Sequence, residues 1–178
     1  MQVQLAAPPH HHSLVDLLCE LHAYYNEGHL VARELVQSYL VEHLLAADSP
    51  LRLAVACEGP AQVIGFAAIS LTYSLVEPAP ELRRQCWLKE LYVCSGQRSR
   101  GAGRALMSWV ARYAVDNGCA RIDWPVNAHN PRGLAFYESL GARRVAERVS
   151  YRLAGSELHT LAGDRLQPGR EGPPPARR

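Results

Sequence analysis

The sequence contains no apolar run long enough to cross a membrane, and its N-terminus lacks the basic and apolar regions of a secretory leader. Its five cysteines are scattered and form no C-x-x-C pair, which argues against a disulfide framework and against a zinc site. Lysine is nearly absent: the sequence has one lysine, Lys89, and eighteen arginines. We therefore expect a soluble, cytoplasmic protein that needs no metal and has neither a membrane nor a nucleic acid as partner.

The apolar content of 48% in 178 residues is enough for one folded domain. We place this domain at residues 1–153. Residues 154–178 are rich in glycine and proline and have little to bury, so we expect a largely flexible extension with a short helix near its start. The sequence is compatible with a monomer and with a homodimer.

The charges are divided unevenly along the chain. Residues 1–97 carry five basic and ten acidic side chains, whereas residues 98–152 carry ten arginines and four acidic side chains. The basic half favours a polyanionic ligand, and the acidic half is compatible with a cationic amine. The same charges are equally compatible with an ordinary solvated surface.

The stretch Trp87–Leu106 joins an apolar extended run to an amphipathic helix through the turn Arg98–Gly103. Apolar residues of the predicted helix recur every three or four positions, at Ala102, Ala105, Leu106, Trp109, Val110 and Tyr113. A helix that opens on glycines leaves its first backbone N–H groups free and accessible, so a phosphate can approach them closely. This turn is a candidate anion cradle.

A second motif follows a predicted strand in which Ala120, Ile122, Trp124 and Val126 alternate. Asn130 is a good helix N-cap, Pro131 suits the first helical position, and Gly141 suits the end of the helix. The two motifs, Arg98-x-x-Gly101-x-Gly103 and Asn130 to Tyr137 followed by Ser139-Leu140-Gly141-Ala142, together resemble the GNAT superfamily of N-acetyltransferases, and among them the small-molecule amine and polyamine acetyltransferases. The resemblance covers about Leu51–Leu153, and Gly133 departs from it because the family more often has alanine there.

The resemblance implies an α/β fold with a mixed central sheet of about seven strands, split between the fourth and fifth, and about four flanking helices. Other local patterns agree with this layout. They predict a weak strand Val3–Leu5, a helix capped by Ser13 and Asp16, and a helix Leu30–Ala46. A hairpin of Leu51–Cys57 and Val63–Tyr73 follows, with a bulge or a close backbone approach at Gly65. The segments Arg143–Val145 and Val149–Leu153 are predicted to be the closing strands.

Acetyl transfer from a thioester to an amine needs a neutral nitrogen, a stabilised oxyanion and a proton for the departing thiolate. The resemblance places Tyr137 as the general acid. Glu90 is the one acid in an apolar strand, so it is a candidate general base or a carboxylate that holds the substrate's ammonium. Its neighbour Lys89 makes a polyamine substrate less favourable, and only one of the two can face the pocket unless a bulge intervenes.

By the same resemblance, acetyl-CoA is the cosubstrate. Its predicted binding residues are Leu91, Tyr92, Val93, Arg98, Ser99, Arg100, Gly101, Ala102, Gly103, Arg104, Asn130 and Tyr137. Predicted acceptor-binding residues are Tyr24, Tyr25, Glu27 and Glu90. The leading functional hypothesis is acetylation of a primary amine on a small molecule. Acetylation of a protein N-terminus or lysine, and CoA binding without turnover, remain as alternatives.

Overall fold

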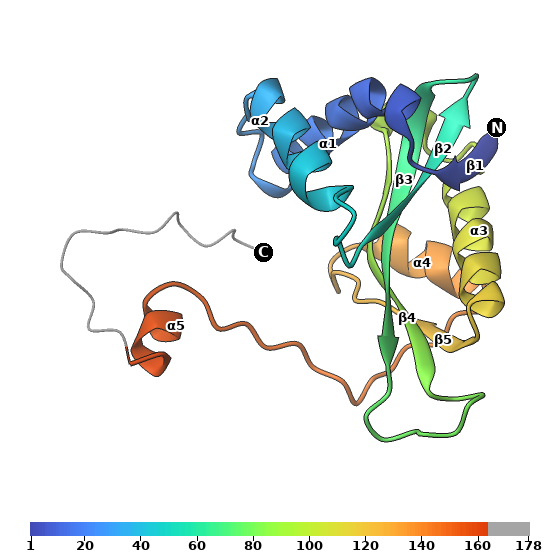
Figure 1. Cartoon of the computed structure of the whole chain (residues 1–178), viewed down its shortest axis with the longest axis vertical. Helices are drawn as coiled ribbons and strands as arrows, with labels where there is room; N and C mark the ends of the chain where they lie inside the picture. Colours follow the sequence, from blue (N-terminus) through green and yellow to red (C-terminus); the bar gives the residue numbers. More distant parts are fainter. Residues whose placement is uncertain (164–178) are drawn as a thin grey trace. The chain divides into compact units, whose positions relative to one another are not determined.

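The computed structural model describes residues 1–163 (Figure 1). The chain divides into two compact units, Met1–Leu134 and Ala135–Arg178, of which the second is described as far as residue 163. The greater part of the extension expected to be flexible, residues 164–178, thus lies outside the described residues. None of the helices within residues 1–163 is both long and apolar enough to cross a membrane.

The first unit is built on a mixed five-stranded sheet, which replaces the predicted seven strands. The strands follow chain order across the sheet: β1 (Gln2–Leu5), β2 (Arg52–Glu58), β3 (Gln62–Tyr73), β4 (Arg84–Val93) and β5 (Cys119–Asp123). β1 to β4 are antiparallel neighbours, whereas β5 runs parallel to β4. The predicted first strand, hairpin and central strand are therefore confirmed.

Five α-helices occur in the described residues, rather than the predicted four. They are α1 (His11–Tyr25), α2 (Arg33–Tyr39), α3 (Ala102–Asp116), α4 (Pro131–Ser139) and α5 (Gly155–Leu161), with short turns η1 (Pro8–His10), η2 (Leu40–Leu44) and η3 (Ser95–Gln97). The predicted helix Leu30–Ala46 is shorter, because its second half, η2, is wound as a π-helix. The short helix expected after residue 154 is present as α5.

The two faces of the sheet bury different helices (Figure 1). On one face Leu14 of α1 and Leu40 of η2 pack with Phe66 of β3 in a continuous apolar cluster. On the other face α3 buries Leu106 and Val110 of the predicted apolar stripe, whereas the two aromatic residues of that stripe are only partly buried. Each of these fully buried side chains contributes roughly 1.5–3 kcal/mol of transfer free energy.

The N-terminus of α1 is held differently from the prediction. The helix begins at His11, so the predicted capping role of Ser13 is wrong. Ser13 Oγ instead donates to Ala61 O at 2.8 Å and accepts from Val63 N at 2.9 Å, which ties α1 to the β2–β3 turn. His10 is buried, and its Nδ1 accepts a hydrogen bond from Ala7 N at 3.0 Å.

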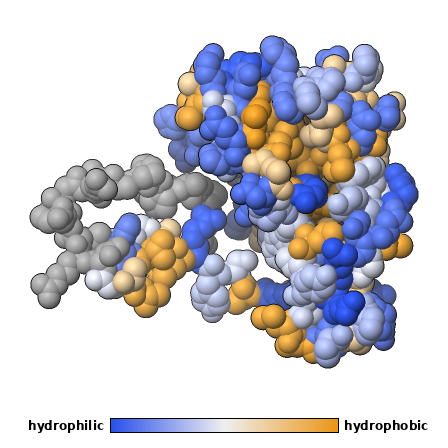
Figure 2. Space-filling view, in the orientation of Figure 1, coloured by the Kyte–Doolittle hydropathy of each residue, from blue (hydrophilic) through white to orange (hydrophobic). Residues whose placement is uncertain are grey.

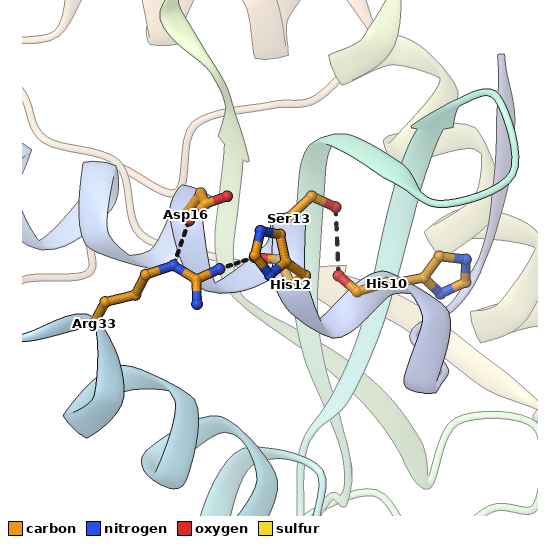
Figure 3. Close-up of polar contacts among 5 residues, drawn as sticks. All are labelled: His10, His12, Ser13, Asp16 and Arg33. Atoms are coloured by element: carbon orange, nitrogen blue, oxygen red, sulfur yellow. Dashed lines mark hydrogen bonds and ion pairs between the residues drawn. The ribbon is translucent and has the colours of Figure 1, made fainter.

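Arg33 of α2 forms two hydrogen bonds with α1 (Figure 3). Arg33 Nε donates to Asp16 Oδ1 at 2.9 Å, and Arg33 Nη2 donates to His12 O at 2.8 Å. The run His10–His12 therefore contributes a buried side chain and a backbone acceptor to the packing of α1. These contacts give His10 and His12 a structural role at the start of α1.

The two predicted closing strands are wrong within the described residues. Neither 143–145 nor 149–153 forms a strand, and the side chains of Val149 and Tyr151 are 73% and 93% exposed. Alternating apolar residues become a strand only when a neighbouring strand satisfies their backbone groups. The local pattern of these segments could not reveal whether such a neighbour is present.

Gly65 lies at a close approach of β3 to β4. A Cβ at this position would lie 2.8 Å from the backbone oxygen of Tyr92. The β2–β3 register also shifts beside it, between Ala56 and Cys57. Both features anticipated from the sequence, the bulge and the close approach, are therefore present.

We expect Gly65→Ala to destabilise the fold by about 1–3 kcal/mol, because the added methyl group must push two hydrogen-bonded strands apart. Urea unfolding monitored by circular dichroism measures this change. Gly96→Ala is the matched control, since a Cβ at Gly96 would have open space around it. Equal stability of the two variants would show that the strands separate without cost.

Candidate active site

A β-bulge in β4 determines which way the charged pair Lys89 and Glu90 faces. In the β3–β4 register Ile69 pairs with Leu88 and Ala68 pairs with Glu90, so Lys89 is the extra residue. Glu90 therefore shares a face with Tyr92, on the side covered by α1, while Lys89 is exposed. Without the bulge, Glu90 would share the face of Leu88, which is fully buried.

The Glu90 carboxylate is half-buried and accepts two hydrogen bonds. Tyr25 Oη, at the end of α1, donates to Oε2 at 3.1 Å, and the backbone N of Leu91 donates to Oε1 at 3.1 Å. Burial raises the pKa of Glu90, while these hydrogen bonds and the charge of Lys89 act in the opposite direction. A carboxylate in this setting can take up and release a proton more readily than one in free solution.

The predicted acceptor-binding residues are only partly assembled around Glu90. Tyr25 contacts it directly, and the ring of Tyr24 packs edge-on against Tyr25 at 5.2 Å. Glu27 lies in the turn after α1 with a positive φ of 54° and is exposed. Figure 2 shows apolar surface on the visible face of the first unit, where α1 and α2 meet the strands.

The second half of β4 has an edge that no strand covers within the described residues. β5 pairs with β4 only as far as Trp87 opposite Asp123, whereas β4 continues to Val93. We call this uncovered side of Leu88–Val93 the open edge of β4. Cys94 N donates to Ile64 O of β3, and Leu91 N donates to the Glu90 side chain. N–H directions alternate along a strand, so those of Leu91 and Val93 lie on the open edge.

A group of hydrogen-bonded side chains around the buried Tyr92 fixes the end of β4. Arg98 Nε donates to Val93 O at 2.9 Å, and the Arg98 guanidinium lies 5.4 Å from the centre of the Tyr92 ring. Glu20 of α1 accepts from Ser95 N at 3.0 Å. Burial and a hydrogen bond to Glu20 raise the pKa of Tyr92 to about 12. The side chain of Arg98 thus holds the end of β4. The backbone of Arg98 remains part of the turn that leads into α3.

The turn itself has the conformation that a phosphate cradle requires. Gly101 is the N-cap of α3 with a φ of +89°, a left-handed conformation that favours glycine. The backbone N–H groups of the first turn have no acceptor within the helix, and the positive end of the helix dipole lies there. Gly101 and Arg104 are exposed. The geometry therefore fits an anionic group at the N-terminus of α3.

The N-terminus of α4 is capped as predicted, and its unusual glycine has a structural reason. Asn130 Oδ1 accepts from Gly133 N at 2.9 Å. A Cβ at Gly133 would lie 2.7 Å from Asn130 Nδ2, so alanine there would displace the capping side chain. Gly133 thus preserves this cap.

Tyr137 belongs to the second unit, where it lies in α4. Its ring centre is 5.1 Å from that of Phe136, and its side chain is half-buried. Its backbone oxygen accepts from Leu140 N and Ala142 N, which ends the helix. Its role as the general acid stays a prediction.

Sequence reasoning missed two contributors to this site. Glu20 carries no local signal, because it looks like any exposed acid on an amphipathic helix. Arg132 donates through Nη2 to Ser99 Oγ at 2.8 Å, and these two residues are far apart in the sequence. A search for basic side chains next to the second motif would have found Arg132 but not its partner.

Comparison with known families agrees with this geometry. The model of the Acetyltransferase (GNAT) family matches residues 13–142, which is most of the chain. The chain therefore belongs to the GNAT acetyltransferase family. This match includes β4, the cradle and the whole of α4.

Several individual proteins are similar to this chain. Thialysine N-epsilon-acetyltransferase of Bos taurus is 29% identical over 60% of this chain and 61% of its own length. L-ornithine N5-acetyltransferase of Arabidopsis thaliana is 31% identical over 56% of this chain and 42% of its own length. The chain thus spans less than two thirds of these two relatives. An integron cassette protein from the mobile metagenome of V. cholerae has a solved structure with a TM-score of 0.79 and 31% identity, covering 90% of this chain and 96% of that protein.

Proposed function

We propose that this protein transfers an acetyl group from acetyl-CoA to a primary amine of a small molecule. The observation that carries the proposal is the placement of Glu90 beside the open edge of β4, on the same strand that leads into the cradle at α3. Family membership supports acetyl transfer. The two curated relatives are named for the terminal amines of thialysine and ornithine, which supports an amino acid-like acceptor.

Acetyl-CoA supplies an acetyl group activated as a thioester. The N-terminus of α3 holds its diphosphate, and the open edge of β4 pairs with its extended arm. Glu90 takes a proton from the acceptor's ammonium, directly or through a water, so that the neutral nitrogen can attack the carbonyl carbon. The N–H of Val93 donates to the carbonyl oxygen as negative charge develops there. When the C–S bond breaks, Tyr137 protonates the departing sulfur, and the proton that the acetylated nitrogen still loses returns to the tyrosinate, directly or through a water.

The proposal is tested by measuring thiol release from acetyl-CoA together with the mass of the acetylated product. The acceptors are thialysine, ornithine, polyamines, aminoglycosides, and peptides with a free N-terminus or lysine. Turnover with a small amine supports the proposal, and turnover with peptides alone overturns the acceptor class. Binding of acetyl-CoA without thiol release for any acceptor would establish a binding protein instead.

Gly103→Val is expected to weaken acetyl-CoA binding at least tenfold, about 1.4 kcal/mol, because a branched side chain in the first turn of α3 obstructs the approach of a phosphate. Isothermal titration calorimetry measures the dissociation constant. Ser108→Val introduces the same side chain at an exposed position of the same helix and serves as the control. Unchanged affinity in folded Gly103→Val protein would contradict the assignment of the cradle.

A further inference from the structure

A side chain from the segment after β5 reaches the cradle that follows β4. Arg132, in the first turn of α4, donates through Nη2 to Ser99 Oγ at 2.8 Å. Ser99 lies two residues before Gly101, the N-cap of α3. The guanidinium of Arg132 is therefore held at the rim of the cradle, although the sequence motif for this turn does not include it.

Two other arginines of the turn are directed elsewhere. Arg98 donates to Val93 O and lies against Tyr92. Arg100 Nη1 donates to Gln97 Oε1 at 3.1 Å, and Gln97 Nε2 donates in turn to Glu58 Oε2 at 3.2 Å. Their hydrogen bonds thus serve the protein's own strand end and loop.

Arg132 is the arginine that reaches this turn from another segment, and its partner there is the neutral hydroxyl of Ser99. No ion pair between Arg132 and a carboxylate occurs within residues 1–163. Its side chain is also exposed, so the guanidinium keeps its charge available to a ligand. A planar guanidinium matches two phosphate oxygens in a bidentate manner.

The backbone conformation next to Arg132 and at Ser99 is constrained by local contacts and dihedral angles. Asn130 caps α4 through Gly133 N, and a Cβ at Gly133 would lie 2.7 Å from the amide nitrogen of that capping side chain. Ser99 adopts a positive φ of 63°, which is uncommon for a residue with a Cβ. Unfavourable conformations of this kind concentrate at ligand-binding sites.

We propose that Arg132 is a phosphate-binding residue that closes the cradle over the diphosphate of acetyl-CoA, and that Ser99 Oγ positions its guanidinium for this contact. This inference rests on the proposed function, because acetyl-CoA supplies the phosphates. It adds a cation from α4 to a cradle formed by the turn Arg98–Gly103 and the first turn of α3.

The experiment measures acetyl-CoA dissociation constants by calorimetry for the unmodified protein and for Arg132→Gln, Arg132→Lys, Ser99→Ala and the Arg132→Gln/Ser99→Ala double variant. Arg132→Gln is expected to weaken acetyl-CoA binding about tenfold. Arg132→Lys is expected to weaken it less, because lysine keeps the positive charge but cannot bind two phosphate oxygens at once. Ser99→Ala is expected to weaken binding a few-fold. The double variant should bind like Arg132→Gln, since Ser99 acts through Arg132.

Arg112→Gln is the matched control. It removes the same charge from an exposed position of α3 about 15 Å along the helix from Ala102, so we expect unchanged affinity. Between low and high salt, the affinity of Arg132→Gln should fall less steeply than that of Arg112→Gln, because one phosphate contact is missing. Circular dichroism confirms that each variant is folded.

Each outcome has a defined meaning. If the unmodified protein binds acetyl-CoA and Arg132→Gln binds it like Arg112→Gln, the inference is wrong while the proposed function stands. A double variant clearly weaker than Arg132→Gln overturns the positioning role of Ser99. A loss that disappears with 3′-dephospho-CoA assigns Arg132 to the 3′-phosphate and overturns the diphosphate contact. Failure of the unmodified protein to bind acetyl-CoA overturns the proposed function itself.

Discussion

Tyr137→Phe is expected to lower kcat by roughly 10²–10⁴-fold while the dissociation constant of acetyl-CoA stays the same. The substitution keeps the aromatic ring that packs beside Phe136 and removes only the hydroxyl group that would protonate the thiolate. Steady-state kinetics on an acceptor identified by the screen measures kcat, and calorimetry measures the affinity. The combined result separates a lost proton donor from a damaged binding site.

Tyr151→Phe is the control for this substitution. Tyr151 lies in the same unit and is 93% exposed, so losing its hydroxyl group should change neither quantity. Full turnover by Tyr137→Phe would show that a water or the acceptor protonates the thiolate instead.

Glu90→Gln is expected to lower kcat by a comparable factor, about 10²–10⁴-fold, because the amide cannot accept a proton from the acceptor. The raised pKa of Glu90 has a further consequence for the pH profile. The carboxylate is the active form, so the rate of the unmodified enzyme should fall as the pH drops through a value above the usual range for glutamate. This acidic limb should disappear in Glu90→Gln.

Tyr25→Phe tests the same assignment while leaving the carboxylate in place. The hydrogen bond from Tyr25 favours the charged form of Glu90 and so lowers its pKa. Removing this bond should therefore move the midpoint of the acidic limb to higher pH.

An increase in KM for the acceptor with unchanged kcat in Glu90→Gln would contradict the role of Glu90 as the base. It would show that Glu90 only binds the ammonium.

The cradle could be predicted from sequence because its signals are local. Gly101 provides the positive φ that begins α3, and the apolar residues of α3 follow one another at three- and four-residue spacing. The cap at Asn130 is equally local, since it joins residues within one helical turn. Interactions between near neighbours in the chain leave a pattern that is readable in a short window.

The direction of Glu90 could not be predicted in the same way. Its choice of face depends on one extra residue in the pairing of β4 with β3, and a strand's own sequence does not show its register. The contact between Arg132 and Ser99, and the support that Glu20 gives to Ser95, also join distant segments. Each exists only after the strands have brought those segments together.

The sequence by itself determined the family, the turn that opens α3 and the candidate acid and base, because short motifs encode them. The tertiary structure alone decided that Glu90 rather than Lys89 faces the α1 side, that Tyr25 contacts it, and that β4 has an open edge beyond Trp87. The physical reason is that register, bulges and strand ends depend on hydrogen bonds between segments remote in the chain, whose energies no local pattern contains.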